Sequence, residues 1–135
     1  MSEHGKVEGD GYALANLDDL GEGYGFRKIR KELDVKAFGI NAIVMPPGHA
    51  AGFHSHEEQE ETYFVHQGTA EFSFGDGTKH VVGSGGVVRV DAPTVLSVKN
   101  VGEDDLVYVC AGGKDGYVGR DGVMAEGASR SEPPA

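Results

Sequence analysis

The most informative segment of this chain runs from Gly48 to Gly68 and reads GHAAGFHSHEEQEETYFVHQG. Its histidines His54 and His56 are two residues apart. On a β-strand, residues at this spacing point to the same face, so both imidazoles can reach one metal ion. Glu61 begins the next apolar run and offers a carboxylate oxygen. Imidazole nitrogen together with carboxylate oxygen favours a divalent transition metal, namely iron, manganese, nickel, copper or zinc.

The spacing within this stretch resembles the first motif of the cupin superfamily. That motif runs glycine, five residues, His-x-His, three or four residues, glutamate, six residues, glycine, and its positions are occupied here by Gly48, His54, His56, Glu61 and Gly68. Glu60 also fits the looser spacing to the histidines, but only Glu61 leaves six residues before the second glycine. The resemblance implies an all-β fold, the cupin double-stranded β-helix or jelly-roll barrel, over residues 37–112. It also implies that the metal site lies inside the barrel.

The second cupin motif is incomplete in this chain. Asn100 fits its last position, and Gly83 fits its first position within about one residue. The family places a histidine four residues before the asparagine, where this chain has Leu96. Asp91 and Pro93 stand where a proline and a glycine are usual. The resemblance therefore implies three protein ligands for the metal, His54, His56 and Glu61, instead of four.

From residue 37 onward, short apolar runs alternate with turn residues. The runs are bounded by Gly, Pro, Asn or Asp and recur about every 8–12 residues, which is typical of a β-sandwich or barrel. This spacing predicts about six to ten antiparallel strands in two packed sheets. The predicted strands cover residues 38–45, 62–66, 70–74, 79–82, 86–90, 94–98 and 106–111.

The segments on either side of the barrel are predicted to differ from it. Residues 1–36 form an N-terminal extension, of which residues 1–12 are polar, rich in glycine and expected to be loose. Phe26–Leu33 mixes apolar and basic residues and is expected to form an edge strand. Residues 113–135 form a glycine-rich C-terminal segment and tail, and residues 127–135 are expected to be disordered.

The bulk composition is that of one acidic globular domain, because 135 residues suffice for one core. A formal net charge of −10 repels phosphates and anionic lipid headgroups, so neither nucleic acid nor a membrane surface is an expected partner. No apolar run could span a bilayer and no hydrophobic signal region follows the N-terminus, so the cytoplasm is the expected location. The single cysteine, Cys110, lies in an apolar run and is expected to be a buried, unreactive thiol.

Strand periodicity also predicts the lining of the pocket. If Glu61 faces inward, Tyr63 on the same strand does too, and if Leu96 faces inward, so does Asn100. Tyr63, Leu96 and Asn100 are therefore the predicted substrate-pocket residues. His66 is five residues after Glu61, an odd number, so it is expected on the outer face. The resulting pocket is mostly apolar with one polar corner, which suits a small ligand with an apolar body.

Two functions are compatible with these residues. In the first, the protein binds a small molecule through a divalent transition metal held by His54, His56 and Glu61. It would then act as a dioxygenase, isomerase or lyase, with the metal as a Lewis acid or oxygen-binding centre. In the alternative, Leu96 marks a lost site, and the protein is a non-catalytic, metal-free ligand-binding or sensor protein. A homodimer is expected in either case, because exposed sheet edges are usually paired or covered.

Overall fold

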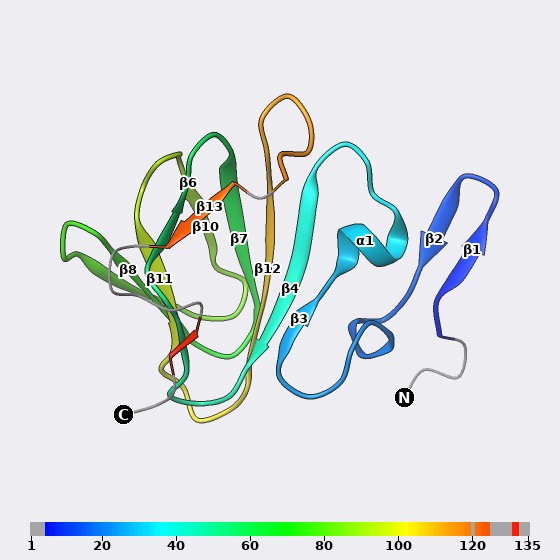
Figure 1. Cartoon of the computed structure of the whole chain (residues 1–135). Helices are drawn as coiled ribbons and strands as arrows, with labels where there is room; N and C mark the ends of the chain where they lie inside the picture. The colour runs from blue at the N-terminus through cyan, green and yellow to red at the C-terminus, as the bar shows by residue number, and fades with distance from the viewer. Residues whose placement is uncertain (1–4, 120, 125–130, 133–135) are drawn as a thin grey trace.

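Two antiparallel β-sheets surround one core (Figure 1). The computed structural model describes residues 5–119, 121–124 and 131–132. The first sheet has five strands, in the order β10 (Val87–Val90), β7 (Glu60–Gln67), β12 (Leu106–Gly113), β4 (Gly39–Met45) and β3 (Gly25–Arg27). The all-β fold predicted from the turn spacing is confirmed.

The second sheet carries the histidine pair. Its strands follow the order β13 (Gly122–Met124), β6 (His54–His56), β11 (Leu96–Asn100), β5 (Ala50–Ala51) and β14 (Ser131–Glu132). Two further strands extend it, because β8 (Ala70–Phe74) pairs with β11, and β9 (Lys79–Val82) pairs with β8. The segment 39–113 therefore supplies the nine strands β4 to β12, within the predicted range.

The core lies between the two sheets and draws on both of them. Strand β7 alternates buried and exposed residues, with Glu61, Tyr63 and Val65 facing inward, as its period of two predicts. The buried apolar cluster consists of Met45, Tyr63, Val65, Ala70, Phe72, Val90, Leu96, Val98, Leu106 and Tyr108. Burying each of the larger side chains contributes about 1.5–3 kcal/mol, so this cluster is the main source of stability.

Gly68 ends β7 in a turn that only glycine suits. Its φ is +91°, and an added Cβ would lie 2.8 Å from the carbonyl oxygen of Asp105. A side chain here would be strained and would also collide with the chain that enters β12. The second glycine of the motif is thus required by the path of the backbone.

The N-terminal extension is more ordered than its sequence predicts. Residues 7–14 form a hairpin of β1 (Val7–Gly9) and β2 (Tyr12–Leu14), so the expectation that residues 1–12 are loose is wrong for the described part of this segment. A 3-10 turn, Leu17–Asp19, follows the hairpin. The expected edge strand over Phe26–Leu33 is a strand only as far as Arg27, and a short helix, α1 (Ile29–Leu33), takes up the rest. The clustering of Arg30, Lys31 and Glu32 gives this stretch no strand alternation.

The C-terminal segment returns to the second sheet. Strand β13 pairs with β6, and β14 pairs with β5. The disordered tail predicted for residues 127–135 falls mostly outside the described residues, but Ser131–Glu132 form a strand, so the prediction is wrong there. The longest helix in the described part of the chain has five residues, so none there could cross a membrane.

Candidate metal centre

Strand β6 places the two histidines on the inner face of the second sheet. It lies between β11, where Leu96 is opposite His54, and β13, where Gly122 is opposite His56. The two imidazole rings are nearly perpendicular, with centroids 5.5 Å apart, and both are half-buried. Nδ1 of His54 lies 2.9 Å from the carbonyl oxygen of Gly52. A carbonyl oxygen can only accept, so Nδ1 carries the proton and Nε2 is left free to bind a metal.

Glu61 reaches the histidines from the facing sheet. Its Oε1 lies 2.9 Å from Nε2 of His56 and accepts a hydrogen bond of 2.7 Å from the hydroxyl of Tyr63. Its Oε2 accepts a hydrogen bond of 3.2 Å from the thiol of Cys110. Burial alone would raise the pKa of Glu61, but its contacts with His56, Tyr63 and Cys110 outweigh burial and lower it. Glu61 is therefore an ionised acceptor, the form that binds cations.

The pKa of His56 is raised for the complementary reason. Burial of the ring lowers it, but the hydrogen bond to Glu61 and the negative charges of Glu61 and Asp121 outweigh that effect. Nδ1 of His56 lies 3.0 Å from Nε2 of Gln59. The Gln59 amide can donate to a neutral Nδ1 or, after rotation by half a turn, accept from Nδ1–H. The second orientation frees Nε2 of His56 for a metal.

The donor atoms have the separation that a metal centre requires. One ligand atom each from His54, His56 and Glu61 can be chosen so that all lie within 4.8 Å of one another. Two ligands held about 2.1 Å from a metal at a right angle are about 3 Å apart, close to the 2.9 Å between His56 Nε2 and Glu61 Oε1. The residues present therefore fit a divalent transition metal with three protein ligands.

Asp121 holds the loop that joins the two ligand-bearing strands. Its carboxylate accepts hydrogen bonds from the backbone amides of Glu58, at 3.0 and 3.1 Å, and of Gln59, at 2.9 Å. It also lies 4.0 Å from Nδ1 of His56. Burial would raise the pKa of Asp121, but the backbone amides and the charge of His56 lower it. No local pattern in the sequence indicates this role, since Asp121 is more than sixty residues from the loop it binds.

Gly112 makes room for the site on the strand beside Glu61. It is opposite Glu61 in the pairing of β12 with β7. An added Cβ would lie 2.6 Å from Oε1 of Gln59, 2.9 Å from the carbonyl oxygen of Glu60 and 3.0 Å from Cγ of Glu61. Any larger residue would displace the side chains that face the histidines.

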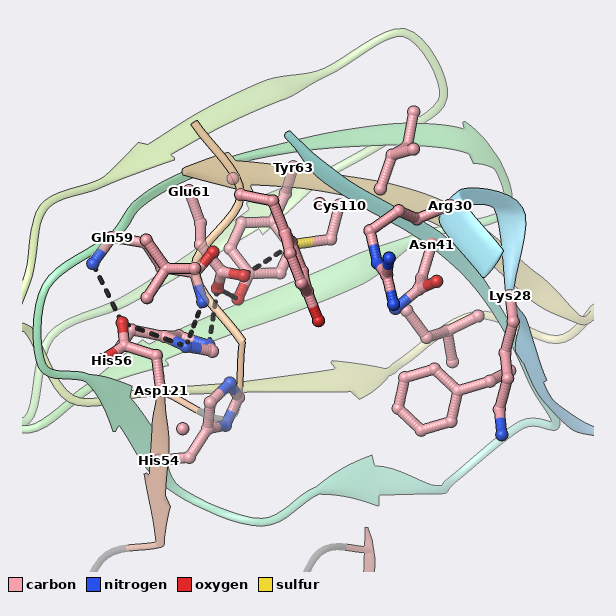
Figure 2. Close-up of a pocket in the computed structure, with 18 of the residues that line it drawn as sticks. Lys28, Arg30, Asn41, His54, His56, Gln59, Glu61, Tyr63, Cys110 and Asp121 are labelled. Atoms are coloured by element: carbon pink, nitrogen blue, oxygen red, sulfur yellow. Dashed lines mark hydrogen bonds and ion pairs between the residues drawn. The ribbon is translucent and has the colours of Figure 1, made fainter. Parts of the chain in front are cut away.

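A cavity of about 600 Å³ opens from this centre, and Figure 2 shows the side chains that line it. Of the predicted pocket residues, Tyr63 lines the cavity, whereas Leu96 and Asn100 are not among its lining residues. Leu96 is fully buried in the core. The Asn100 amide donates to the carbonyl oxygens of Met45 and Asp104, both at 2.9 Å, and so ties a barrel corner together.

Cys110 and His66 lie on opposite faces of the first sheet. His66 is exposed on the outer face of β7, as predicted. Cys110 faces inward and lines the cavity, so the thiol is partly buried and not sealed in the core. Burial and the neighbouring Glu61 raise its pKa strongly, so the thiol stays protonated. Its contact with Glu61 follows from the pairing of Cys110 with Tyr63 across β12 and β7, a register the sequence did not specify.

Comparison with known proteins assigns the barrel to a family. A family model described as the cupin domain matches residues 42–112, just over half of the 135 residues. Among curated proteins no match was found. The structure is similar to an uncharacterised protein with a double-stranded β-helix domain from Klebsiella pneumoniae, with a TM-score of 0.68 and 17% identity, covering 84% of this chain and 96% of that chain. The predicted double-stranded β-helix is thereby confirmed.

Two further solved structures are enzymes. A DMSP lyase from Ruegeria pomeroyi has a TM-score of 0.58 and 21% identity, covering 66% of this chain and 43% of that chain. The oxalate decarboxylase of Bacillus subtilis, described with Mn(II) centres, has a TM-score of 0.60 and 20% identity, covering 78% of this chain and 29% of that chain. The chain thus spans less than half of either enzyme, and the similarity is one of fold.

Proposed function

The chain belongs to the cupin family, and on that premise we propose that it binds a divalent transition metal through His54, His56 and Glu61 and holds a small molecule in the adjoining cavity. The observation that carries the proposal is the convergence of three ligating atoms within 4.8 Å of one another, at the edge of a cavity of about 600 Å³. Cavities of about 300–1,000 Å³ are typical of small-molecule sites.

The residues around the ligands support this function by fixing their orientation. The Gly52 carbonyl oxygen holds the His54 ring with Nε2 turned away from it. Gln59 contacts Nδ1 of His56, and Tyr63 and Cys110 each donate to Glu61. Such outer contacts set the tautomer of a ligating histidine and the position of a ligating carboxylate.

A metal held here would act as a Lewis acid, with coordination positions open to a small molecule, as in a site of two histidines and one carboxylate. The inner face of the barrel would exclude bulk water from the bound molecule. Burial and the charge of Glu61 raise the pKa of Tyr63 well above its ordinary value, so its hydroxyl holds its proton and keeps donating to Glu61. The reaction would be of the dioxygenase, isomerase or lyase type, and the DMSP lyase of similar fold is an analogy for the last of these.

Metal titration of untagged, metal-free protein tests this proposal. We expect one Mn²⁺ or Zn²⁺ ion per chain by isothermal titration calorimetry. His54→Ala, His56→Ala and Glu61→Gln should each weaken binding at least about hundredfold, since loss of an outer-shell contact alone costs about 10–100-fold. His66→Ala is the matched control, because His66 lies on the same strand as Glu61 but faces outward. Metal binding that survives all three site variants would overturn the proposal.

One observation favours a second candidate, a metal-free ligand-binding protein. His56, Glu61, Tyr63 and Cys110 already satisfy one another by hydrogen bonds and an ion pair. The fourth ligand position of the family is taken by Leu96, which is fully buried. If wild-type protein binds none of Mn²⁺, Fe²⁺, Ni²⁺, Cu²⁺ or Zn²⁺ in the titration above, this second function replaces the first.

A further inference from the structure

The cavity has a second polar end, opposite the metal ligands. In Figure 2, Lys28, Arg30 and Asn41 lie on one side of the cavity, and His56, Glu61 and Asp121 lie on the other. Lys28 and Arg30 come from the β3–α1 segment, which precedes the matched cupin residues 42–112. This end of the cavity is therefore built from outside the matched part of the chain.

The charges at the two ends differ in how they are neutralised. Lys28, Arg30 and Lys31 all line the cavity, and they are three of only 12 lysines and arginines in a chain of net charge −10. Among the described residues, the ion pairs within 4.0 Å involve Lys6, Lys36, His56 and Arg89, and none includes these three cations. The acidic residues of the cavity wall, Glu61 and Asp121, are already engaged by hydrogen bonds.

Arg30 is held in place and is not free in solvent. Its guanidinium carbon lies 4.0 Å from the ring centroid of Tyr117, a cation–π contact. The Tyr117 ring in turn rests on Gly39, where an added Cβ would lie 3.4 Å from the ring. Stacking fixes the plane of the guanidinium but leaves its N–H groups available to an oxyanion.

We infer that Arg30 and Lys28 form an oxyanion subsite, so that the bound small molecule carries a carboxylate or phosphate group at the end remote from His54, His56 and Glu61. This inference rests on the proposed function and names the class of molecule that the same cavity takes. Apolar side chains of the cavity lining, among them Phe26, Ile43 and Ala51, would contact the body of the molecule. Tyr117 is a positioning residue that acts through Arg30.

Three matched probes test the subsite: benzoate, its uncharged analogue benzamide, and phenyl phosphate. Binding is measured by NMR titration of the full chain, with and without Zn²⁺, the diamagnetic substitute for Mn²⁺. Backbone amide resonances of cavity-lining residues such as Gly39 report binding in every variant, and the Arg30 side-chain Nε–H resonance is followed where Arg30 is present. Benzoate or phenyl phosphate should bind and benzamide should not, and the relative affinity of the two anions identifies the oxyanion. Arg30→Gln should weaken anion binding about tenfold or more, the scale of one charge-assisted hydrogen bond. Arg89→Gln, at an exposed arginine paired with Glu60 and Asp91, is the control.

The outcomes separate this inference from the proposed function. Arg30→Gln should leave Zn²⁺ affinity within about twofold of wild type, because Arg30 is not among the three ligating residues. If metal binds but neither anion does, or if Arg30→Gln and Arg89→Gln behave alike, the subsite is overturned while the metal site stands. If the anion binds in an Arg30-dependent way and no metal binds, the subsite stands and the metal proposal fails.

A second pair of variants tests the role of Tyr117. Tyr117→Phe keeps the aromatic face and should retain anion affinity within about threefold. Tyr117→Leu removes the face and should approach the effect of Arg30→Gln, with the Arg30 Nε–H resonance broadened or shifted in the free protein. Equal anion affinities for the Phe and Leu variants would show that Tyr117 does not position Arg30.

Discussion

Leu96 lies directly opposite His54 in the pairing of β11 with β6, and its side chain is fully buried. Opposed residues of an antiparallel pair project from the same face with Cβ atoms about 4.5–5.5 Å apart. The residue in the family's fourth ligand position therefore stands beside His54, a proposed metal ligand, on the inside of the barrel. The backbone of β11 thus brings position 96 next to His54, and the difference from the family motif is confined to the side chain.

Leu96→His is expected to restore the fourth ligand. Because the frame is already in place, affinity for Zn²⁺ or Mn²⁺ should rise about tenfold or more. Without metal, the variant should lose about 1–3 kcal/mol of unfolding free energy, since an imidazole replaces a buried apolar side chain. Calorimetric titration and urea denaturation measure the two effects.

Leu106→His is the matched control for that experiment. Leu106 is equally buried but lies six residues before Gly112 along β12, near the far end of the barrel. The Leu106→His protein should be destabilised about as much as the Leu96→His protein but should gain no metal affinity. A Leu96→His variant that gains no more metal affinity than Leu106→His would show that the inner face cannot accommodate a fourth ligand.

Gly112→Ala is expected to impair the metal centre from the neighbouring strand. The added methyl group would meet Gln59, Glu60 and Glu61 at 3.0 Å or less, which should cost about 1–3 kcal/mol of stability. The displaced Glu61 should also lower metal affinity. Gly122→Ala is the control, because its Cβ would make an ordinary 3.5 Å contact with His56. Equal metal affinities for the two variants would contradict this explanation.

Asp121→Asn should weaken the protein in a pH-dependent way. The pKa of Asp121 is lowered in the folded state, so the unfolded chain takes up the proton first as pH falls. Its stabilisation is therefore complete above about pH 5 and is lost as pH drops through the ordinary value of about 4 and then through the lowered folded value. At pH 7, we expect the free energy of unfolding of the metal-free wild type to exceed that of the variant by about 1 kcal/mol. Denaturation measured from pH 7 to pH 2 should show the unfolding free energies of wild type and variant converging as pH falls. A difference between them that does not change with pH would refute the role of the carboxylate.

Cys110 should resist alkylation in the folded protein even though it lines the cavity. Its pKa is raised strongly by burial and by Glu61, and only the thiolate reacts. At pH 8, iodoacetamide should label it at least about hundredfold more slowly than in urea-unfolded protein. Glu61→Gln should speed labelling, as it removes the neighbouring charge. Rapid labelling of the folded wild type would mean that the thiol is ionised.

The open edge of β3 should pair two copies of the chain. Strand β3 is the last strand of its sheet, and Tyr24 just before it and Phe26 within it are 61% and 57% exposed. Edge strands of this kind are usually covered or paired, so light scattering should give a dimer mass at micromolar concentration. Tyr24→Lys should shift the mass toward the monomer, while Val81→Lys, on the other sheet, should not. A wild-type monomer would rule out this pairing.

The sequence predicted the parts of the structure that follow local periodicity. Alternation identified the inward face of β7, and the two-residue spacing identified the histidines of β6. Strands β5 and β13 have only two or three residues, too few for any periodicity. Asp121 and Arg30 reach the cavity through contacts between distant segments, and no local pattern records such contacts.

The pairing of β6 with β13 has a consequence for the order of biosynthesis. Residues 54–56 leave the ribosome more than sixty residues ahead of residues 122–124, which complete the outer edge of their strand. Until then Asp121 has not been synthesised, and the loop amides of Glu58 and Gln59 lack their acceptor. Strand β6 is thus synthesised early, but its pairing with β13 forms late. The proposed metal site is therefore complete only once residues 121–124 have been translated and have paired with β6.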